Sequence, residues 1–283
     1  MKNEAPDLVH VHSTLASFYG RIAASLCRIK TLYTVHGWHF AHEPSHLKRC
    51  LKIGAERLLK SITSYWVTVS EFDKRLGTEY SIFRNGCVKT IPNGVKSSQN
   101  EFIPADQRAK SVVFVGRASY QKNCEALVDV VAHMQSDSQL TMYTSGGDID
   151  ALMKRIEQKS LTEKINVILN EPNASEKVHQ FPIMLMTSRY EGMPLSVLEA
   201  MREGLVIVST DVCGMNEVII DGESGYLLPE GSEKQMAQRV DQLIADPVQL
   251  NKMSLRSKAL FDERFALHKM LNEIRHIYQG ILL

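Results

Sequence analysis

Short runs of apolar, mostly β-branched residues alternate along this chain with longer segments whose apolar positions recur at helical spacing. The short runs predict strands at residues 8–12, 31–35, 66–69, 89–91, 112–115, 140–143, 166–169, 183–186, 206–209 and 225–228. The longer segments predict helices at residues 16–28, 47–61, 122–134, 149–158, 194–202, 234–245, 248–261 and 268–283. Because strands that alternate with helices form βαβ units, the pattern indicates an α/β fold with parallel sheets.

A polar segment interrupts this alternation at residues 96–110, which carry no apolar period and are typical of a linker. We therefore expect two doubly wound, Rossmann-like domains, one over residues 1–105 and one over residues 106–265. The second block has about the six strands that such a domain needs. The first block has only about four and opens almost directly on a strand, so we expect it to be incomplete at its N-terminus.

Composition and charge narrow the class of protein. Apolar residues make up 44% and charged residues 23% of the 283 residues, as in soluble globular proteins. The net charge of +1 gives no reason to expect nucleic acid as a partner. Residues 1–100 nevertheless carry 14 basic and 7 acidic side chains, against 19 basic and 25 acidic in the remainder. This asymmetry is compatible with two domains and with an anionic surface near the first.

The cysteines and the hydropathy of the chain bear on its location. Its five cysteines form no Cys-x-x-Cys pair, so we expect reduced thiols rather than a zinc site or a disulfide framework. No apolar stretch approaches the roughly 20 residues of a membrane-spanning helix. Residues 1–7 also lack the apolar core of a signal peptide. We therefore predict a cytoplasmic location.

The segment from Ser188 to Glu199 carries the first candidate chemistry. It follows the apolar strand at 183–186 and enters a helix with Pro194 near its first position, where proline is favoured. Ligands of open α/β sheets bind at such strand ends. Free amides at the start of this helix would attract a phosphate, and they belong to Leu195, Ser196 and Val197.

Two carboxylates belong to the same segment. Glu191 lies in the loop, and Glu199 lies about two turns into the helix. Each can accept hydrogen bonds from two neighbouring sugar hydroxyls. Their spacing alone favours two solvated carboxylates near a helix start. The strand, glycine, proline and helix start that surround them favour a sugar site.

Three further loops end strands of the second block. In the first, Gly116 allows a ligand to approach the backbone, and Arg117 and Lys122 can reach one diphosphate. Taken alone, these two cations are equally typical of a basic surface. The next loop contains Gly146, and the last contains Glu217. Because the strand ends share one edge of the sheet, the combination indicates a diphosphate joined to two sugars.

These motifs resemble the family 4 glycosyltransferases, which are retaining enzymes of the GT-B fold. Glu191 and Glu199 match the Glu-x7-Glu hallmark of that family, and Gly116, Arg117 and Lys122 match its Gly-Arg-x4-Lys element. Segments on both sides of the linker resemble the family as well: Pro-Asp-Leu-Val-His-Val-His-Ser, Tyr-Thr-Val-His-Gly, Val-Thr-Val-Ser-Glu, Ile-Pro-Asn-Gly-Val, Asp-Val-x-Gly-x-x-Glu-Val-Ile and Asp-Gly-x-x-Gly-Tyr-Leu-Leu-Pro. The resemblance covers essentially the whole chain.

The resemblance implies a role for each matched residue. Arg117 and Lys122 would neutralise the diphosphate, Glu199 would hold the ribose and Glu191 the donor sugar. His36 would reach the transferred sugar from the other domain. The residues assigned to catalysis are thus His36, Arg117, Lys122 and Glu191, and those assigned to donor binding are Gly116, Gly146, Met193, Leu195, Ser196, Glu199 and Glu217.

The resemblance also implies the reaction and its partners. A hexose would move with retention from a nucleotide-diphosphate sugar to a saccharide or lipid-linked acceptor, in cell-surface polysaccharide synthesis. No metal and no cofactor are expected. Residues 266–283 would form a C-terminal helix that crosses back to the first, acceptor-side domain. The chain departs from the family pattern at Cys213, where paired glycines are usual, and at Val206, where proline is common.

Alternatives remain open at several points. An incomplete first domain is also compatible with a non-catalytic remnant that folds and binds nucleotide but transfers nothing. A dinucleotide oxidoreductase is disfavoured, because no Gly-x-Gly-x-x-Gly follows a first strand. The basic, amphipathic helix at 47–61 fits either contact with an anionic membrane at the inner face of the cell membrane or ordinary packing on the sheet. His10 and His12 fit packed histidines better than catalytic ones.

Overall fold

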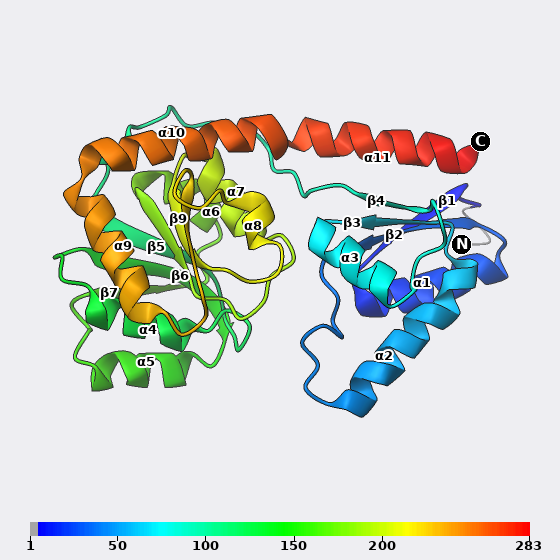
Figure 1. Cartoon of the computed structure of the whole chain (residues 1–283), viewed down its shortest axis with the longest axis horizontal. Coiled ribbons are helices and arrows are strands. Elements are labelled where there is room, and N and C mark those ends of the chain that lie inside the picture. Colours follow the sequence, from blue (N-terminus) through cyan, green and yellow to red (C-terminus); the bar gives the residue numbers. More distant parts are fainter. Residues whose placement is uncertain (1–4) are drawn as a thin grey trace. The chain divides into compact units, whose positions relative to one another are not determined.

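The computed structural model describes residues 5–283, which form two compact units (Figure 1). The chain up to Gly94 and the segment Leu267–Leu283 form the first unit. Val95–Ala266 form the second unit.

The first unit contains a four-stranded parallel sheet in the order β1-β2-β3-β4. Its strands and helices are β1 (Leu8–His12), α1 (Thr14–Leu26), β2 (Lys30–Val35), α2 (His46–Leu59), η1 (Lys60–Ile62), β3 (Tyr65–Thr68), α3 (Glu71–Glu79), β4 (Val88–Thr90) and α11 (Leu267–Leu282). Strands that are neighbours in the sequence are therefore also neighbours in the sheet, as in a run of βαβ units.

Each face of this sheet has its own apolar core. On one face, Tyr33, Val35 and Trp66 pack with Ile53 of α2 and Leu76 of α3. On the other face, the core contains residues of β2 and β3, the residue that follows β4 and two residues of the C-terminal helix α11, namely Leu32, Val67, Ile91, Ile277 and Ile281. The last helix of the chain thus completes the core of the unit that contains the first strand. Both faces are covered, as parallel sheets require.

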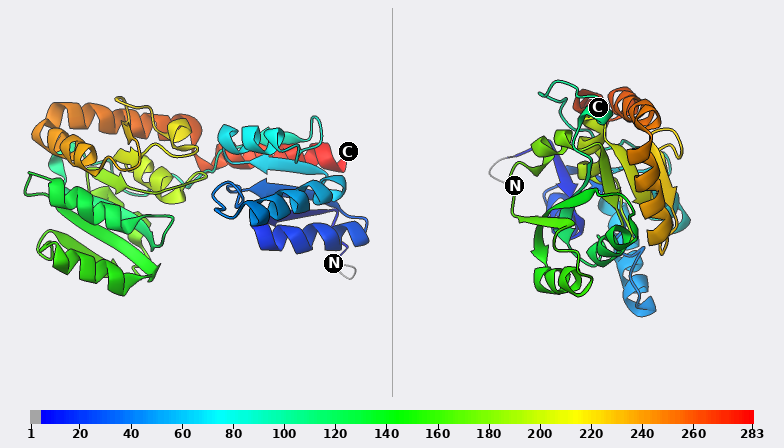
Figure 2. Two further views of the ribbon diagram at one scale, coloured as in Figure 1. Left: turned by 60° about the horizontal axis from the view of Figure 1, so that its bottom comes forward. Right: turned by 90° about the vertical axis from the view of Figure 1, so that its left-hand side faces the viewer.

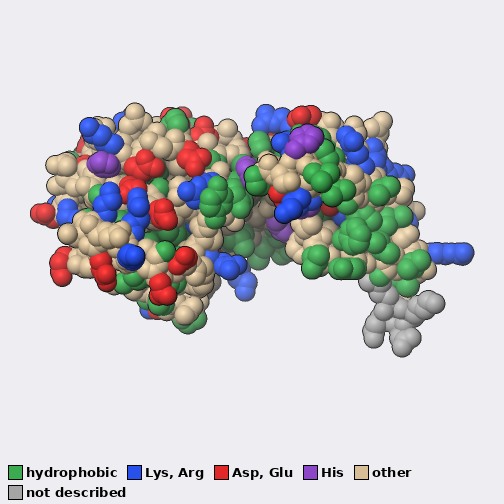
Figure 3. All heavy atoms as spheres, turned by 90° about the horizontal axis from the view of Figure 1, so that it is seen from below, with side chains coloured by type: hydrophobic (Ala, Val, Ile, Leu, Met, Phe, Trp, Pro, Cys, Tyr) green, Lys and Arg blue, Asp and Glu red, His purple; other side chains and the backbone are tan. Residues whose placement is uncertain are grey.

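Helix α1 has its polar residues inside and apolar residues outside. Ser17, Arg21 and Ala24 are fully buried. The large apolar side chains of α1 and of α2 include several exposed ones, and Leu26 and Leu58 retain 80% and 79% of their accessible surface. Figure 3 looks onto a face of the molecule where hydrophobic side chains gather beside lysines and arginines. We call the following residues the α1–α2 face: Leu15, Phe18, Tyr19, Leu26, Leu47, Leu51 and Leu58.

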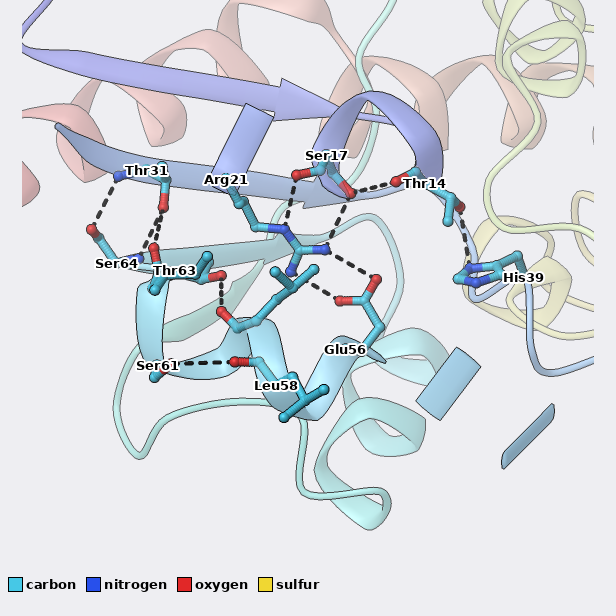
Figure 4. Close-up of polar contacts among 12 residues, drawn as sticks. Thr14, Ser17, Arg21, Thr31, His39, Glu56, Leu58, Ser61, Thr63 and Ser64 are labelled. Carbon is cyan, nitrogen blue, oxygen red and sulfur yellow. Dashed lines mark hydrogen bonds and ion pairs between the residues drawn. The ribbon is translucent and has the colours of Figure 1, made fainter. Parts of the chain in front are cut away.

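A buried ion pair holds α1 against α2 (Figure 4). Arg21 donates to both carboxylate oxygens of Glu56, at 2.9 and 3.1 Å, and its guanidinium lies over the ring of Tyr33. It also donates to the carbonyl and hydroxyl oxygens of Ser17. The Ser17 hydroxyl donates in turn to the Thr14 carbonyl. Every donor group of the buried guanidinium therefore has an acceptor nearby, which such burial requires.

The second unit contains a six-stranded parallel sheet in the order β10-β9-β8-β5-β6-β7. Its elements are η2 (Ala105–Gln107), β5 (Ser111–Ala118), α4 (Cys124–His133), β6 (Gln139–Gly147), α5 (Ile149–Gln158), β7 (Ile165–Leu169), α6 (Ala174–Lys177), η3 (Val178–Gln180), β8 (Ile183–Met186), α7 (Leu195–Arg202), β9 (Val206–Thr210), α8 (Met215–Val218), β10 (Gly225–Leu228), α9 (Glu233–Ala245) and α10 (Pro247–Arg264). This order is that of the doubly wound dinucleotide-binding fold.

Helices cover both faces of this sheet (Figure 2). Helix α4 packs against α5 and α9, whereas α7 packs against α6 and α10. Between these layers, Ile183 to Met186 of β8 are fully buried. The chain reverses its direction of winding between β5 and β8, which are paired neighbours. Such a reversal opens a crevice at the carboxyl ends of the two strands, where ligands bind.

Besides the short helices α6 and α8, two longer segments differ from the sequence-based expectation. Helix α3 was not predicted, because it contains few apolar residues. The segment 96–110, predicted as a linker, is partly packed into the second unit. Arg108 is buried there and donates to the carbonyl oxygens of Ile103, Phe181 and Glu203. These hydrogen bonds attach the segment to the second unit. A charged residue of the expected linker is therefore part of the interior of that unit.

Candidate functional site

Two loops of the second unit, one after β5 and one after β8, are joined by hydrogen bonds. The Arg189 amide donates to the Gln121 carbonyl at 2.8 Å, and the Gln121 side chain donates to the Tyr190 carbonyl at 3.0 Å. The Thr187 hydroxyl donates to the Asn123 carbonyl at 3.0 Å. These bonds hold the two loops in a fixed position relative to each other, at the switch point of the sheet.

Lys122 and Glu191 form a buried ion pair at this junction. The Lys122 ammonium lies 2.6 Å from Oε1 of Glu191, and the Ser188 hydroxyl donates to the same oxygen at 2.6 Å. Only 5% of the Glu191 side chain and 14% of the Lys122 side chain are exposed. The Gln121 amide approaches the second carboxylate oxygen at 3.4 Å. The Glu191 carboxylate is therefore held by three side chains.

The family resemblance assigns Lys122 to a diphosphate and Glu191 to a sugar, whereas in the structure the two side chains form one ion pair. A buried carboxylate needs a partner, because desolvation of an unpaired charge costs several kcal/mol. The pair satisfies both charges. A ligand that engages either residue has to compete with the other for it, so binding to one changes the state of both.

Arg117 is the cation of this group that remains exposed. It belongs to the end of β5, and its guanidinium lies next to Gly146 at the end of β6. The register of β5 and β6 shifts after Arg117, so that Gly146 is passed over in the pairing and takes a left-handed φ of 56°. This bulge turns the end of β6 beside the guanidinium.

Gly116 and Gly147 meet steric requirements that only the structure reveals. A Cβ on Gly147 would lie 1.5 Å from the Ala118 carbonyl oxygen, so only glycine fits there. A Cβ on Gly116 would lie 2.9 Å from the Phe114 ring and 3.3 Å from Cε of Lys122. Gly116 therefore leaves room for the stem of Lys122, in addition to any approach of a ligand.

Helix α7 begins directly after the Glu191 loop. Pro194 precedes it, and the Pro194 carbonyl accepts the Val197 amide at 3.1 Å. The expectation that the Val197 amide is free was therefore wrong. Among the described residues, the backbone amides of Leu195 and Ser196 have no hydrogen-bond partner. Met193, which precedes them in the loop, is buried.

The other two acidic residues lie at the same edge of the sheet. Glu199 is half-buried on α7, and partial burial raises the pKa of its carboxyl, an effect that nearby Arg202 opposes. Glu217 is half-buried on α8, past the end of β9. β9 adjoins β8, so three neighbouring strand ends bring Arg117, Glu191 and Glu217 to one edge.

Two cavities open at these strand ends. The smaller one has a volume of about 180 Å³ and is lined by Gly116, Arg117, Thr144, Ser145, Asn170 and Glu171, among others. The larger one has a volume of about 470 Å³, and Tyr120, Asp148 and Arg189 are among its lining residues. Asn170 and Glu171 follow β7 and were not identified from the sequence. The rule that strand ends share an edge could have found them.

His36 lies in the first unit, directly after β2. Its Nε2 lies 2.9 Å from Nδ1 of His12 at the end of β1. Packing of the two rings removes part of the water around them, which lowers the pKa of His36, and the charge of a protonated His12 lowers it further. Nearby, Nδ1 of His39 lies 3.1 Å from the Thr14 hydroxyl (Figure 4).

Within residues 5–283, no group of three or more His, Cys, Asp or Glu side chains is arranged to hold a metal ion. Over the same residues, every helix is too short or too polar to cross a membrane.

Comparisons with known families match both units of the chain. A model described as "Glycosyl transferases group 1" matches residues 96–259, and one described as "Glycosyltransferase Family 4" matches residues 1–99. The O-antigen biosynthesis glycosyltransferase WbnH of Escherichia coli is 28% identical over 249 residues, covering 88% of this chain and 70% of that protein. The Escherichia coli UDP-Gal:alpha-D-GlcNAc-diphosphoundecaprenol alpha-1,3-galactosyltransferase is 25% identical over 301 residues, covering 98% and 76%.

Solved structures share the fold. HepE from Anabaena, crystallised with UDP and glucose, superposes with a TM-score of 0.88 at 18% identity, covering 99% of this chain and 79% of that one. The sucrose-phosphate synthase of Thermosynechococcus elongatus gives 0.83 at 16% identity, covering 97% and 73%.

Proposed function

Because this chain belongs to the group 1 glycosyl transferases, enzymes of family 4 with the GT-B fold, we propose that it transfers a hexose from a nucleotide-diphosphate sugar to a saccharide or lipid-linked acceptor, with retention. In this reaction the bond between C1 of the sugar and the diphosphate breaks. A bond from C1 to an acceptor hydroxyl oxygen forms on the same face, and the hydroxyl passes its proton to the departing diphosphate.

The observation that carries this proposal is the group of charged side chains at the β5–β8 switch point. Arg117 supplies an exposed cation, Lys122 a second one, and Glu191 and Glu199 supply carboxylates within the same loop and helix. Negative charge develops on the departing diphosphate, and fixed cations that stabilise it are usually the largest source of rate enhancement in such a site. A diphosphate between two sugars matches this distribution of charge.

We assign the parts of the donor as follows. The diphosphate binds Arg117 and the free amides of Leu195 and Ser196, and it draws Lys122 away from Glu191. Glu191 then accepts hydroxyls of the donor sugar, and Glu199 accepts those of the ribose. Gly116, Gly146, Met193 and Glu217 shape the donor site, and His36 contacts the transferred sugar. Release of the Lys122–Glu191 pair would couple recognition of the phosphate to recognition of the sugar.

The names of the relatives support a role in polysaccharide synthesis. WbnH is an O-antigen glycosyltransferase, and the galactosyltransferase above acts on a diphosphoundecaprenol-linked sugar. We propose that the acceptor of this chain is a saccharide of the same general kind, free or carried on a lipid, and that the transfer takes place in the cytoplasm.

Calorimetry on the full chain tests donor binding. We expect UDP-hexoses or GDP-hexoses to bind in the micromolar to millimolar range. Replacing Arg117 by Gln should weaken binding about tenfold or more, because a charge-assisted hydrogen bond to phosphate contributes about 1.5–3 kcal/mol. Lys154→Gln, which removes an exposed cation of α5, serves as the matched control. No binding of either nucleotide sugar at millimolar concentration would contradict the donor-site assignment.

Transfer is tested separately with a panel of acceptors, including undecaprenyl-diphosphate sugars. NMR of the product reports the anomeric configuration, and inversion would contradict retention. Donor binding without transfer to any acceptor would instead support the alternative of a non-catalytic remnant, which the comparisons do not favour.

We also propose that the α1–α2 face contacts an anionic membrane surface. On α2, exposed Leu47, Leu51 and Leu58 form a stripe at helical spacing, with Lys48 and Arg57 beside it. Over the described length of α1 and α2, the only acidic residue is Glu56, which is buried against Arg21. An apolar stripe bordered by cations is the pattern of helices that lie on anionic lipid.

A further inference from the structure

Three histidines form a row on one face of the four-stranded sheet. Alternate residues of a strand point to the same face, so His10 and His12 of β1 share a face. β1 and β2 run parallel, with His12 opposite Thr34, which places His36, two residues further on, at the end of the same row. The face is that of Leu32, which the C-terminal helix α11 covers.

The rings of this row contact one another in sequence. The ring centroids of His10 and His12 are 4.2 Å apart. Those of His12 and His36 are 5.2 Å apart, with an interplanar angle of 25°. Nδ1 of His12 and Nε2 of His36 are 2.9 Å apart, which is a hydrogen-bond distance.

His10 stands at the other end of the row, and both of its ring nitrogens lie within hydrogen-bond distance of a hydroxyl group. Nε2 of His10 lies 2.7 Å from the Thr34 hydroxyl, and Nδ1 lies 2.7 Å from the hydroxyl of Tyr278 on α11. Two hydrogen bonds from different elements fix the plane of the His10 ring. Because His12 packs on that ring, its orientation toward His36 is also restricted.

We propose that His12 is a positioning residue that fixes the ring orientation of His36 and makes its tautomer depend on that of His12. A neutral imidazole carries one N–H and one lone pair, and a hydrogen bond between two such rings needs one of each. Whichever role Nε2 of His36 takes toward His12, its Nδ1 takes the complementary one. Nδ1 of His36 therefore donates when Nδ1 of His12 donates and accepts when Nδ1 of His12 accepts, so the two rings change tautomer together.

The charges around the row are compatible with neutral rings. Partial loss of hydration lowers the pKa of His12 and of His36 below the ordinary value of 6.5, and it lowers the pKa of His10 to about 4. All three rings are therefore mostly uncharged at pH 7, a state in which one ring can donate and the other accept in the hydrogen bond between His12 and His36.

The importance of His12 for transfer rests on the proposed role of His36 in contacting the sugar. Loss of His12 would leave the His36 ring free to turn and to exchange tautomers independently. Part of the molecules would then present the wrong edge of the ring to a sugar hydroxyl. The effect should fall on the turnover rate more than on donor affinity, because the nucleotide-binding residues of the second unit are untouched.

NMR on the full, histidine-labelled chain tests the positioning directly, without any substrate. Long-range nitrogen–proton correlations identify the protonated nitrogen of each ring. In the native chain, we expect the tautomer populations of His12 and His36 to match, because each tautomer of one ring requires one tautomer of the other. In His12→Phe, which keeps a ring but removes its nitrogens, we expect the His36 populations to move toward those of an imidazole without a partner. In His12→Asn, whose amide can bond Nε2 of His36 in place of Nδ1, we expect a smaller change. His133→Phe, on the surface of α4, is the matched control.

Unequal tautomer populations at His12 and His36 in the native chain, or an unchanged His36 spectrum in His12→Phe, would overturn the inference. Kinetics supply the second measurement. We expect His12→Phe to lower kcat about tenfold or more, the size seen when a partner that orients a functional histidine is removed, with little change in donor KM and partial rescue in His12→Asn. A native chain without transferase activity would contradict the proposed function and leave the NMR result standing as evidence on the histidine row.

Discussion

At the scale of single residues, the pairing of Lys122 with Glu191 is the feature that sequence reasoning could not supply. The two residues are 69 positions apart, and the resemblance assigned them to different parts of the donor. Their contact depends on how the loops after β5 and β8 are joined, through backbone bonds such as that from Arg189 to Gln121. Backbone hydrogen bonds of this kind carry no sequence signature, whereas Arg117 and Glu199 were identifiable from motif and position.

Glu199 gives a prediction about pH. Partial burial raises the pKa of its carboxyl above 4.5, so the folded protein begins to protonate Glu199 at a higher pH than an ordinary glutamate. Only the charged form accepts both ribose hydroxyls. We therefore expect affinity for a nucleotide sugar, whose diphosphate keeps its charge throughout, to fall as the pH is lowered from 7.5 toward 5. Calorimetry at several pH values measures this.

The matched variant for this prediction is Glu199→Gln. It should bind more weakly than the native chain at pH 7.5, and its affinity should depend less on pH. A native affinity that stays constant between pH 7.5 and 5 would show that Glu199 does not bind the ligand in its charged form.

At the scale of elements, most strands and long helices were predictable because their apolar periods are strong. Helix α3 was missed because its sequence, Glu-Phe-Asp-Lys-Arg-Leu-Gly-Thr-Glu, has few apolar positions. Its start could have been found from Ser70, whose side chain caps the Asp73 amide. The inverted polarity of α1 could not be foreseen, because a buried arginine is identifiable only once Glu56 is known to lie opposite.

The Arg21–Glu56 pair predicts an asymmetric effect on stability. Arg21→Met leaves a buried carboxylate without its partner, and we expect the first unit to lose about 3–5 kcal/mol of unfolding free energy. The double variant Arg21→Met with Glu56→Leu should recover much of that loss. Urea unfolding followed by tryptophan fluorescence measures it, because both tryptophans, Trp38 and Trp66, belong to the first unit.

Recovery in the double variant is the informative result. If the double variant is as unstable as Arg21→Met, the loss comes from packing around Ser17 and Tyr33 rather than from the unpaired charge.

The α1–α2 face predicts binding to lipid vesicles. We expect the chain to float with vesicles that contain phosphatidylglycerol and not with pure phosphatidylcholine. Leu51→Ser with Leu58→Ser should weaken this binding on the order of 100-fold, because each buried leucine contributes about 1.5 kcal/mol or more. Flotation in a density gradient measures the bound fraction.

The control replaces exposed apolar residues of the second unit, Val248→Ser with Leu255→Ser. Equal binding by both double variants would locate lipid contact elsewhere. Concentration-dependent dimerisation that only the α1–α2 variants abolish would identify a second copy of the chain as the occupant of this face.

At the scale of the whole molecule, the division into two units predicts how a nucleotide stabilises the chain. A ligand at 100 times its dissociation constant stabilises the unit that binds it by about 2.7 kcal/mol. For a unit of this size, we expect the calorimetric transition of the second unit to rise by about 5–10 °C. The transition seen by tryptophan fluorescence should stay in place, because it reports on the first unit. Equal shifts in both signals would show that the units unfold together.

The second unit was the more predictable part of the molecule, because its six strands follow the doubly wound order and its motifs lie at their ends. The first unit is discontinuous in sequence, and the periodicity of residues 267–283 does not reveal that Ile277 and Ile281 complete its core.

That discontinuity has a consequence during synthesis. The strands of the first unit leave the ribosome early, but Leu32, Val67 and Ile91 stay uncovered until α11 follows. Val95–Ala266 must be made in between, which at 5–20 residues per second takes on the order of ten seconds or more. The second unit can therefore finish folding first, while the first remains a nascent intermediate with an open apolar face. Chaperones that hold such faces have that interval in which to act.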